Sequence, residues 1–291
     1  MIYRIHHRTS YSYGEPVAVS HHAARLAPME LETQETRDFQ LIIDPVPALR
    51  KTRLDYFGNR VCFFSIQETH DRLDVSATST VIVHATTPAA TAVSMAWEDV
   101  SRMFQDPVSP AVVDPFQFAM DSPMVRRSMT LADYARPSFE AGAPLLEAVE
   151  DLTKRIYTDF QYDPASTDVE TPVERVFEQR RGVCQDFAHL AIACLRSLGL
   201  PARYVSGYLV THPPEGRERL VGGDASHAWF SAYCPEAGWC DFDPTNNVMP
   251  GEEHIPVAYG RDFGDVSPLS GILVGGGRHA IRVSVDVMPI G

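Results

Sequence analysis

The sequence has few cysteines and no long hydrophobic run. Its cysteines are five in number and widely scattered along 291 residues: Cys62, Cys184, Cys194, Cys234 and Cys240. No stretch approaches the roughly 18 apolar residues that a membrane-spanning helix needs, so we expect no membrane partner. The first ten residues carry charge and precede no apolar run, which is unlike a secretory signal. Scattered thiols in such a chain predict reduced cysteines and a cytoplasmic location.

Positive charge is also scarce. The chain has 25 Lys and Arg residues against 38 Asp and Glu residues, which gives a formal net charge of −13. Binding of nucleic acid needs a clustered positive field, so this balance argues against nucleic acid as the main partner. The sequence also lacks internal repeats and low-complexity tracts. A chain of this length with ordinary composition is expected to form two globular domains.

Residues 1–85 have the alternating pattern of β-strands. Two sets of side chains alternate there: Tyr3, Ile5, His7, Thr9, Tyr11 and Tyr13 with Arg4, His6, Arg8, Ser10 and Ser12. This period of two predicts that one face packs and the other is solvated. Turn signals separate three further predicted strands, which cover residues 39–43, 60–66 and 73–83. Several short strands without a long helix predict a β-rich, sandwich-like domain.

A less regular segment, residues 86–142, follows this domain. Small uncharged residues mixed with proline predict a linker over residues 86–96. Residues 97–104 are a candidate for a short helix, and the stretch from there to residue 142 is broken by prolines. We expect the whole segment to connect two domains.

From residue 143 onwards helices precede strands. The first predicted helix carries an apolar stripe at steps of three and four residues: Leu145, Val149, Leu152 and Ile156. A capping box of Thr171, Pro172 and Glu174 predicts the start of a second helix. A third helix is predicted over residues 184–198. The period then changes to two, which predicts strands over residues 202–210, 228–234, 239–243 and 279–287. This order predicts an α+β domain over residues 143–291.

Cys184 is the first candidate for chemistry. It follows Gly182-Val183 and lies in the first turn of the third predicted helix, on the face that also carries Phe187. Backbone N–H groups of a first helical turn have no intrahelical acceptor, and their positive end favours thiolate over thiol. The thiolate is the nucleophilic form. Position alone also allows Cys184 to be a small buried hydrophobic residue.

A second segment supplies candidates for a base. Two alternating runs flank the turn Pro235-Glu236-Ala237-Gly238 and predict a hairpin, with His227 opening the first strand and Asp243 closing the second. An imidazole beside a carboxylate is held in one tautomer, and a cysteine facing such a pair is the arrangement of nucleophilic catalysis. Asp241 has the same strand parity as Asp243, so geometry alone does not separate the two acids.

These motifs resemble a known family. The order Gly-Val-Cys-Gln-Asp-Phe-Ala, His-Ala-Trp and Trp-Cys-Asp-Phe-Asp-Pro-Thr is similar to that of the transglutaminase-like superfamily. The similarity extends along residues 188–209 and 260–268, and residues 3–28 resemble the N-terminal region of bacterial members. The resemblance implies a papain-like α+β core with a triad of Cys184 as nucleophile, His227 as general base and acid, and Asp243 as orienting carboxylate. The Asp-Pro-Thr context favours Asp243 over Asp241.

The implied reaction is acyl transfer on an amide bond of a peptide or protein. Water as the acceptor makes the enzyme a cysteine peptidase or amidase, which we favour, and an amine makes it a transglutaminase. The backbone N–H of Cys184 is the expected first oxyanion donor, and Gln161 or Tyr162 the second. Trp239 is a candidate for substrate binding, whereas Trp229 is expected in the core. Neither a metal nor an organic cofactor is implied. The N-terminal domain could line the substrate cleft or hold the partner of a homo-oligomer.

The same residues allow three other interpretations. A zinc site of Cys184, His227, Cys234 and Cys240 lacks any close Cys-x2-Cys pair. Cys234 and Cys240 could pair as a disulfide, although a reducing compartment favours two thiols. A non-catalytic binding or scaffold protein that retains the fold is the remaining alternative, and the intact cysteine, histidine and aspartate argue against it.

Two further features are expected to be structural. His189 lies on the polar face of the third predicted helix and is expected at the surface or in support of the site. Three consecutive glycines, residues 275–277, follow a strand-like run and do not lead into a helix. They therefore predict a turn or rim loop and not a phosphate-binding loop.

Overall fold

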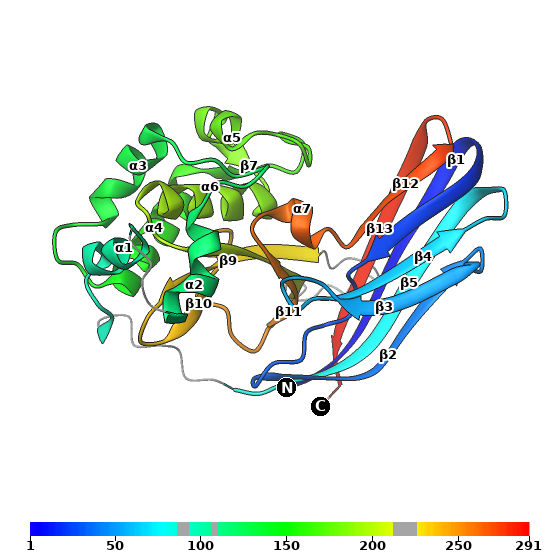
Figure 1. Cartoon of the computed structure of the whole chain (residues 1–291), viewed down its shortest axis with the longest axis horizontal. Coiled ribbons are helices and arrows are strands. Elements are labelled where there is room, and N and C mark those ends of the chain that lie inside the picture. The colour runs from blue at the N-terminus through cyan, green and yellow to red at the C-terminus, as the bar shows by residue number, and fades with distance from the viewer. Residues whose placement is uncertain (86–92, 106–109, 212–225, 291) are drawn as a thin grey trace, which may run out of the picture.

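The computed structural model describes residues 1–85, 93–105, 110–211 and 226–290. These residues form two bodies, a mixed α/β body and a long curled β-sheet, with the two chain termini close together at one end of the sheet (Figure 1). The predicted α+β fold is confirmed. Among the described residues, no helix is long and apolar enough to cross a membrane.

The curled sheet has seven strands, and β1 runs through its centre. The order is β2-β5-β1-β4-β3, with β12 and β13 also paired to β1. The strands are β1 (Ile2–Ala24), β2 (Gln34–Asp44), β3 (Leu49–Leu54), β4 (Arg60–Ile66), β5 (His70–Val83), β12 (Leu269–Gly275) and β13 (His279–Pro289). The predicted strands at 39–43, 60–66 and 73–83 lie within β2, β4 and β5, so the N-terminal pattern was sufficient to find them.

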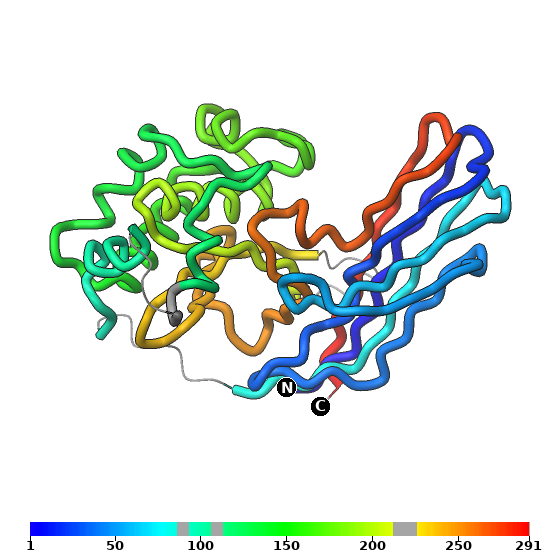
Figure 2. Tube along the Cα trace, viewed as in Figure 1, coloured from blue at the N-terminus to red at the C-terminus, as the bar shows by residue number. Residues whose placement is uncertain are grey.

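The last two strands change the expected division of the chain. β12 pairs with the second half of β1 and β13 with its first half, both antiparallel, so residues 269–289 lie in the N-terminal sheet (Figure 2). We expected these residues in the α+β domain over residues 143–291, and for residues 269–289 that expectation is wrong. Strand alternation shows that a segment is a strand but does not name its partner. Gly275, Gly276 and Gly277 form the turn between β12 and β13, all with positive φ.

The mixed body is built around one central helix. Its helices are α1 (Trp97–Gln105), α2 (Pro110–Phe116), α3 (Met129–Ala135), α4 (Leu145–Asp159), α5 (Val173–Gln179), α6 (Cys184–Ser197) and α7 (Phe263–Val266), with short 3-10 turns at Gln117–Ala119 and Arg136–Ser138. Most of α6 is buried among the other helices and the sheet. Segment 93–142 is therefore not only a connection, because Val100, Phe104 and Leu131 belong to this core.

A four-stranded antiparallel sheet packs on α6. Its order is β10-β9-β8-β11, and its strands are β8 (Ala202–Leu209), β9 (Ser226–Cys234), β10 (Gly238–Phe242) and β11 (His254–Gly260). A two-residue parallel bridge joins β6 (Gln161–Tyr162) to β7 (Arg181–Gly182) just before α6. The strand positions that the sequence predicted in this body are confirmed, whereas β11 was missed.

The predicted capping box at Thr171 is wrong. Helix α5 begins at Val173 with Pro172 as its N-cap, and no side chain caps it. The Thr171 hydroxyl instead donates to Asp168 Oδ1 at 2.8 Å and accepts from the Asp168 backbone N–H at 2.9 Å. A serine or threonine can close such a local turn in place of a helix cap.

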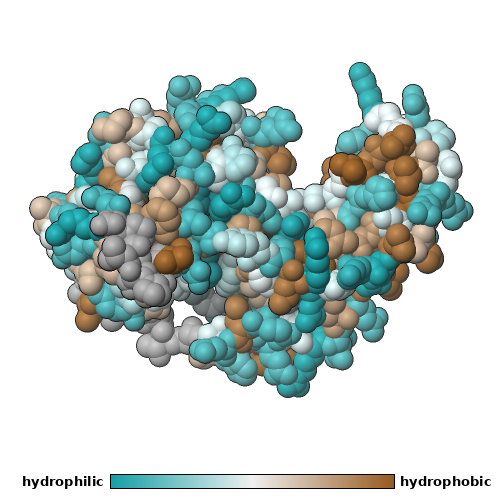
Figure 3. Space-filling model, in the orientation of Figure 1, coloured by the Kyte–Doolittle hydropathy of each residue, from teal (hydrophilic) through white to brown (hydrophobic). Residues whose placement is uncertain are grey.

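The two bodies share a hydrophobic contact. Tyr3, Ile5 and Val81 of the curled sheet form one buried cluster with Tyr208 and Val257 of the smaller sheet. Elsewhere the curled sheet exposes apolar side chains. Figure 3 shows such side chains gathered near the far end of this sheet, where Ile272 and Val274 of β12 are exposed. The expected homo-oligomer stays a prediction.

A buried arginine joins α6 to its surroundings. Arg196 is 1% exposed and donates to the carbonyls of Phe118 (2.8 Å), Ala202 (3.0 Å) and Arg261 (2.7 Å) and to Ser122 Oγ (3.1 Å). Burial lowers the pKa of Arg196 to about 10. Because four acceptors face this guanidinium, it holds the end of α6 against two other segments. One is the stretch before α3 that contains Phe118 and Ser122, and the other is the end of β11.

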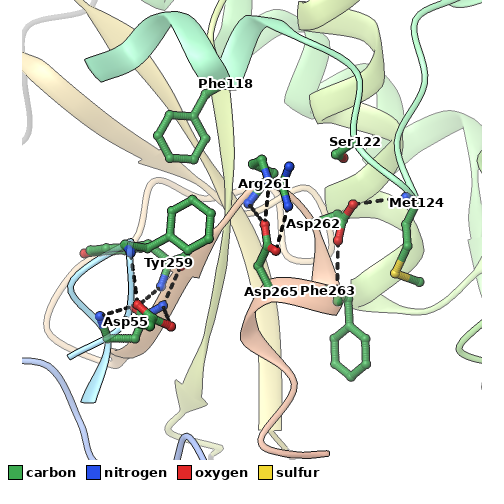
Figure 4. A network of polar contacts seen from close by, with 12 residues as sticks. Asp55, Phe118, Ser122, Met124, Tyr259, Arg261, Asp262, Phe263 and Asp265 are labelled. Atoms are coloured by element: carbon green, nitrogen blue, oxygen red, sulfur yellow. Dashed lines mark hydrogen bonds and ion pairs between the residues drawn. The ribbon is translucent and has the colours of Figure 1, made fainter. Parts of the chain in front are cut away.

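The segment after β11 completes this junction. Asp262 is buried and accepts from the backbone N–H groups of Met124 (3.0 Å) and Gly264 (2.9 Å), while Arg261 pairs with Asp265 at 2.8 Å (Figure 4). The sequence Gly-Arg-Asp-Phe-Gly-Asp therefore has a structural explanation, since it connects β11 and α7 to the loop before α3.

We predict that Arg196→Leu destabilises the protein by about 3 kcal/mol or more, because it leaves buried acceptors without a donor. Urea unfolding monitored by circular dichroism measures this loss. The control is Arg102→Leu, which removes an exposed arginine paired with Asp99 and the Glu98 carbonyl. Its effect should stay within about 0.5 kcal/mol. Equal stability of the two variants would contradict the assigned role of Arg196.

Candidate active site

The first turn of α6 presents Cys184 at a rigid helix start. Val183 is the N-cap residue, and its backbone N–H donates to Asp186 Oδ2 at 2.8 Å. Thr167 Oγ1 donates to the same oxygen at 2.6 Å. Burial raises the pKa of Asp186 above its ordinary value, and these hydrogen bonds oppose the shift. The half-buried Cys184 side chain packs against the core around α6.

Glycine is required just before this turn. A Cβ at Gly182 would lie 2.8 Å from both Cβ and Oδ2 of Asp186, a separation that real side chains do not show. A larger residue would displace the carboxylate that caps the helix. The contacts within the sequence Gly-Val-Cys-Gln-Asp therefore fix the position of the sulfur.

The β9–β10 hairpin supplies the imidazole and the carboxylate. His227 is the second residue of β9, and Asp243 directly follows β10. His227 Nε2 donates to Asp243 Oδ2 at 2.7 Å, with the imidazole 9% exposed and Asp243 fully buried. Cys184 is close enough to raise the pKa of the His227 imidazole through a hydrogen bond and through its charge. The start of α6 and both strands of the hairpin, which are far apart in sequence, therefore contribute to one place in the fold.

Asp241 has different partners. Its carboxylate accepts from Trp229 Nε1 at 2.9 Å and from Ser231 Oγ. Strand parity alone had left open which of the two acids lies beside His227. These contacts decide the question, because of the two acids it is Asp243 that bonds to His227. Trp229 is fully buried, as expected for a core residue.

Asp243 accepts hydrogen bonds on both oxygens. Oδ1 accepts from the backbone N–H groups of Thr245 (2.9 Å) and Asn246 (3.3 Å). Oδ2 accepts from Asn246 Nδ2 at 2.7 Å and from His254 Nε2 at 3.0 Å, besides His227. Burial alone would raise the pKa of Asp243, but these donors hold it well below its ordinary range. The carboxylate is therefore ionised.

The opposite shift affects His227. Burial lowers its pKa, but the hydrogen bonds to Asp243 and Cys184 and the two negative charges outweigh burial and raise the pKa to about 10. The ring is therefore an imidazolium at neutral pH when the sulfur beside it is a thiolate. A half-buried sulfur beside an imidazolium and a buried carboxylate can deliver a nucleophile and a proton to the same place.

His254 is the residue that the sequence analysis missed. It begins β11, and its ring packs edge-on against Trp229 with centroids 5.2 Å apart. Nothing local distinguishes it among the eleven histidines. The only available signal was its place a few residues before the Gly-Arg-Asp-Phe segment, in a strand that was not predicted.

The same contacts bear on metal binding. Among the described residues, His227, Asp243 and His254 are the one group of such side chains whose ligand atoms lie within 4.8 Å of one another. Asp243 Oδ2 already accepts three N–H donors, two of them from these imidazoles, so the arrangement fits a hydrogen-bonded carboxylate better than a metal centre. The zinc interpretation fails because Cys234 and Cys240 face the core around α6, apart from this group.

The two cysteines of the hairpin are not directly opposite each other. Cys234 pairs with Gly238, and Cys240 pairs with Ala232. Both are free and buried, and the Cys234 thiol donates to Glu236 at 3.0 Å.

The two candidates for the second oxyanion donor are the neighbouring residues of β6. Gln161 pairs with Arg181 and Tyr162 with Gly182, so both lie on the bridge that precedes α6. Burial and then the charge of Cys184 raise the pKa of Tyr162, which places its hydroxyl in the field of the sulfur. No such interaction links Gln161 to Cys184 among the described residues. Their role as donors stays a prediction.

Trp239 lies in a different environment. It packs on Phe118 and Tyr233, and the Arg203 guanidinium lies 4.4 Å from its ring and 3.6 Å from that of Tyr259. No contact joins Trp239 to Cys184 or His227 in the described parts of the chain. A role in substrate binding stays a prediction.

The expectation of a surface position for His189 is wrong. The side chain is 3% exposed, and its Nε2 accepts from the backbone N–H of Phe263 at 3.1 Å. Burial lowers its pKa to about 4, so it is neutral. The helical pattern of α6 placed His189 on a polar face, but α7 covers that face from a distant part of the sequence.

Two family models match this chain. Residues 3–82 match the bacterial transglutaminase-like N-terminal region, and residues 132–244 match the transglutaminase-like superfamily. The second range includes Cys184, His227 and Asp243 and ends before His254.

Individual proteins show the same relationship. An uncharacterized protein of Mycobacterium tuberculosis is 41% identical over 295 residues, covering 99% of this chain and 92% of the relative. A Pseudomonas aeruginosa protein-glutamine gamma-glutamyltransferase is 33% identical over 127 residues, which cover 43% of this chain and 19% of that protein. A crystal structure named "Putative Cysteine Protease from Cytophaga hutchinsonii" superposes with a TM-score of 0.75 at 24% identity, covering 100% of this chain and 92% of that one. That structure supports the fold.

We predict that Asp243→Asn lowers the pH at which His227 loses its proton from about 10 toward the ordinary 6.5. The carboxylate raises the pKa, so the imidazolium persists up to about pH 10 in the parent and is lost at lower pH in the variant. The rate of Cys184 alkylation by iodoacetate, whose negative charge favours approach to an imidazolium, measures this alkaline limb.

Asp241→Asn is the matched control, because Asp241 bonds to Trp229 and Ser231 and not to His227. Its alkaline limb should coincide with that of the parent. An alkaline limb that also stays in place in Asp243→Asn would show that the carboxylate does not control the ring.

Proposed function

We propose that this protein, which belongs to the transglutaminase-like superfamily, is a thiol enzyme that hydrolyses amide bonds of peptides or proteins through Cys184, His227 and Asp243. The observation that carries the proposal is the row formed by the sulfur at the start of α6, the imidazole of His227 and the fully buried Asp243, with the last bond at 2.7 Å. The family membership and the fold support cysteine-dependent acyl transfer in general.

The proposed reaction has two stages. The thiolate of Cys184 attacks the amide carbonyl, so a C–S bond forms, and the imidazolium of His227 gives its proton to the departing nitrogen as the C–N bond breaks. Neutral His227 then takes a proton from water, whose oxygen attacks the thioester. The C–S bond breaks, the carboxylic acid leaves, and the thiolate and imidazolium are restored.

Asp243 acts on the ring in both stages. Its Oδ2 accepts the Nε2–H of His227, so the nitrogen that faces Cys184 is the one that exchanges protons. A buried carboxylate also stabilises the imidazolium that forms in the second stage. This division of roles is that of an orienting acid, which does not itself exchange protons.

The oxyanion would lie at the start of α6. The backbone N–H of Cys184 belongs to a first helical turn and has no intrahelical acceptor there. We assign the second donor to the hydroxyl of Tyr162, because it lies in the field of the sulfur. Donors aimed at developing negative charge are typically the largest single contribution to such a reaction.

The choice of acceptor separates two activities. Water is the default acceptor of a thioester, and nothing in the described structure forms a dedicated amine site, so we propose hydrolysis. The amine reaction is the second candidate because the Pseudomonas aeruginosa relative is named a protein-glutamine gamma-glutamyltransferase. We propose a cytoplasmic enzyme, because all five cysteines are free. The net charge of −13 makes nucleic acid an unsuitable partner.

We predict that incubation with a peptide library leaves a thioester on Cys184 that mass spectrometry detects in acid-quenched samples. Cys184→Ala should lose both the adduct and turnover. Adding a primary amine divides the intermediate between hydrolysis and amide formation, and the ratio of the two products identifies the acceptor.

Cys62→Ala is the control, since Cys62 is a buried thiol of the curled sheet. It should retain the adduct and the rate. Rapid reagent labelling of Cys184 without turnover on any amide would favour a binding or scaffold protein and contradict the proposal.

We predict that Tyr162→Phe lowers kcat by about 10²–10³ through loss of an oxyanion donor. Tyr157→Phe is the matched control, because the two tyrosines are 52% and 51% exposed and the charge of Cys184 raises the pKa of Tyr162. Gln161→Ala should resemble the parent, since Gln161 shows no interaction with the sulfur. Steady-state kinetics on one peptide substrate compare the three variants. A large loss in Gln161→Ala alone would assign the donor to the amide instead.

A further inference from the structure

His254 occupies an unusual place beside the candidate active site. It belongs to β11, which is part of neither the β9–β10 hairpin nor α6. Its Nε2 lies 3.0 Å from Asp243 Oδ2. His227 Nε2 lies 2.7 Å from the same oxygen. The two ring centroids are 6.0 Å apart at an interplanar angle of 54°. Two imidazoles therefore share one carboxylate oxygen.

The tautomer of His254 follows from this contact. Asp243 is ionised and can only accept hydrogen bonds, so the nitrogen that faces it must carry a proton. The ring cannot easily turn away, because it is 7% exposed and packs edge-on against Trp229. Trp229 is in turn fixed by its own hydrogen bond to Asp241 at 2.9 Å. His254 is thus a fixed donor aimed at one lone-pair site of Asp243.

His254 has no contact with the sulfur among the described residues, so any effect on the reaction must pass through Asp243. Oδ2 divides its negative charge among His254, His227 and Asn246. Each donor stabilises the carboxylate and lowers the pKa of Asp243, so each one reduces the affinity of this oxygen for a proton. The strength of the bond to His227 therefore depends on whether His254 is in place.

We infer that His254 is a positioning residue for this reaction: its Nε2–H holds Oδ2 of Asp243 and limits how strongly that oxygen binds the proton of His227. The inference rests on the proposed function for its effect on catalysis, but the hydrogen bond itself does not. A ring that is held too strongly as imidazolium is a poorer acid toward the departing nitrogen, so the loss of His254 should slow turnover.

The experiment is proton NMR of the folded chain at neutral pH, which needs no turnover. The wild-type protein should show two low-field imidazole N–H resonances, one from His227 and one from His254, and both should be lost in Asp243→Asn. In His254→Phe the His254 signal is lost and the His227 signal moves further downfield, because Oδ2 then has one donor fewer. Detection of one resonance only in the wild-type protein, or a His227 signal that stays in place in His254→Phe, would overturn the inference.

The conservative variant separates the hydrogen bond from packing. His254→Gln places an amide N–H near the position of Nε2 and should return the His227 resonance to its wild-type place. His254→Phe keeps an aromatic ring against Trp229, and a cavity of about 230 Å³ that His254 lines leaves room for the larger side chain. If the phenylalanine variant does not fold, the two wild-type resonances and the glutamine variant still decide the question.

Kinetics complete the test. In His254→Phe we expect kcat to fall about tenfold or more with KM unchanged, and His254→Gln to recover most of the loss. His21→Gln is the control, since His21 is an exposed histidine of β1 that bonds to Ser65 at 2.7 Å. A residue with a merely structural role would lower thermal stability without moving the His227 resonance.

The two failures are distinguishable. If the resonances behave as described but the wild-type protein turns over no amide, the proposed function is wrong and the hydrogen bond of His254 stands. If the wild-type protein is active and the His227 resonance is the same in His254→Phe, the inference about His254 is wrong and the proposed function stands.

Discussion

A single buried charge constrains this structure more than any other feature. The Asp243 carboxylate is fully buried and ionised, which would be prohibitively costly without compensation. Compensation comes from five hydrogen bonds, given by two backbone N–H groups, one amide and two imidazoles. These donors come from β9, β11 and the turn after β10. Folding the carboxylate into the interior therefore requires that all three segments arrive in one geometry.

The sulfur is positioned by an independent device. Asp186 caps α6 through the Val183 backbone N–H, and Gly182 leaves the room for that carboxylate. The axis of α6 is fixed at its other end by Arg196, which donates to four acceptors. The helix thus has one buried acid at its start and one buried base near its end. The row of Cys184, His227 and Asp243 is formed where this rigid helix meets the hairpin, so precision at the site comes from two separately fixed frameworks.

The sequence could predict what depends on near neighbours. The alternation of β1, the apolar stripe of α4 and the hairpin around residues 235–238 all express a local period, and these elements were found. The meeting of Cys184, His227 and Asp243 could be predicted because each lies at the end of an element whose orientation the pattern gives. The choice of Asp243 over Asp241 came from family resemblance, and the contacts agree with it because Asp241 is bonded to Trp229 and Ser231.

What the sequence could not predict depends on distant partners. His189 lies on a face of α6 that seemed polar, but α7 covers that face, and the histidine becomes an acceptor for the Phe263 backbone N–H. β12 and β13 have ordinary strand patterns, yet they pair with β1, the first strand of the chain. His254 was missed for the same reason, since only the fold brings β11 beside the hairpin. The prediction of a cap at Thr171 was wrong for a different reason, because the threonine forms a local turn with Asp168 in place of a helix cap.

The curled sheet belongs to the framework of the site through β11. The register of β11 against β8 shifts between Pro256 and Ala258. The Pro256 carbonyl instead accepts from the Met29 backbone N–H at 3.0 Å and from Gln34 Nε2 at 3.0 Å, both in the N-terminal part of the chain. Pro256 lies two residues after His254, so these bonds hold the start of β11. His254, a donor to the buried carboxylate, thus depends on contacts with the N-terminal part of the chain. This dependence is a physical reason for the curled sheet to accompany this core.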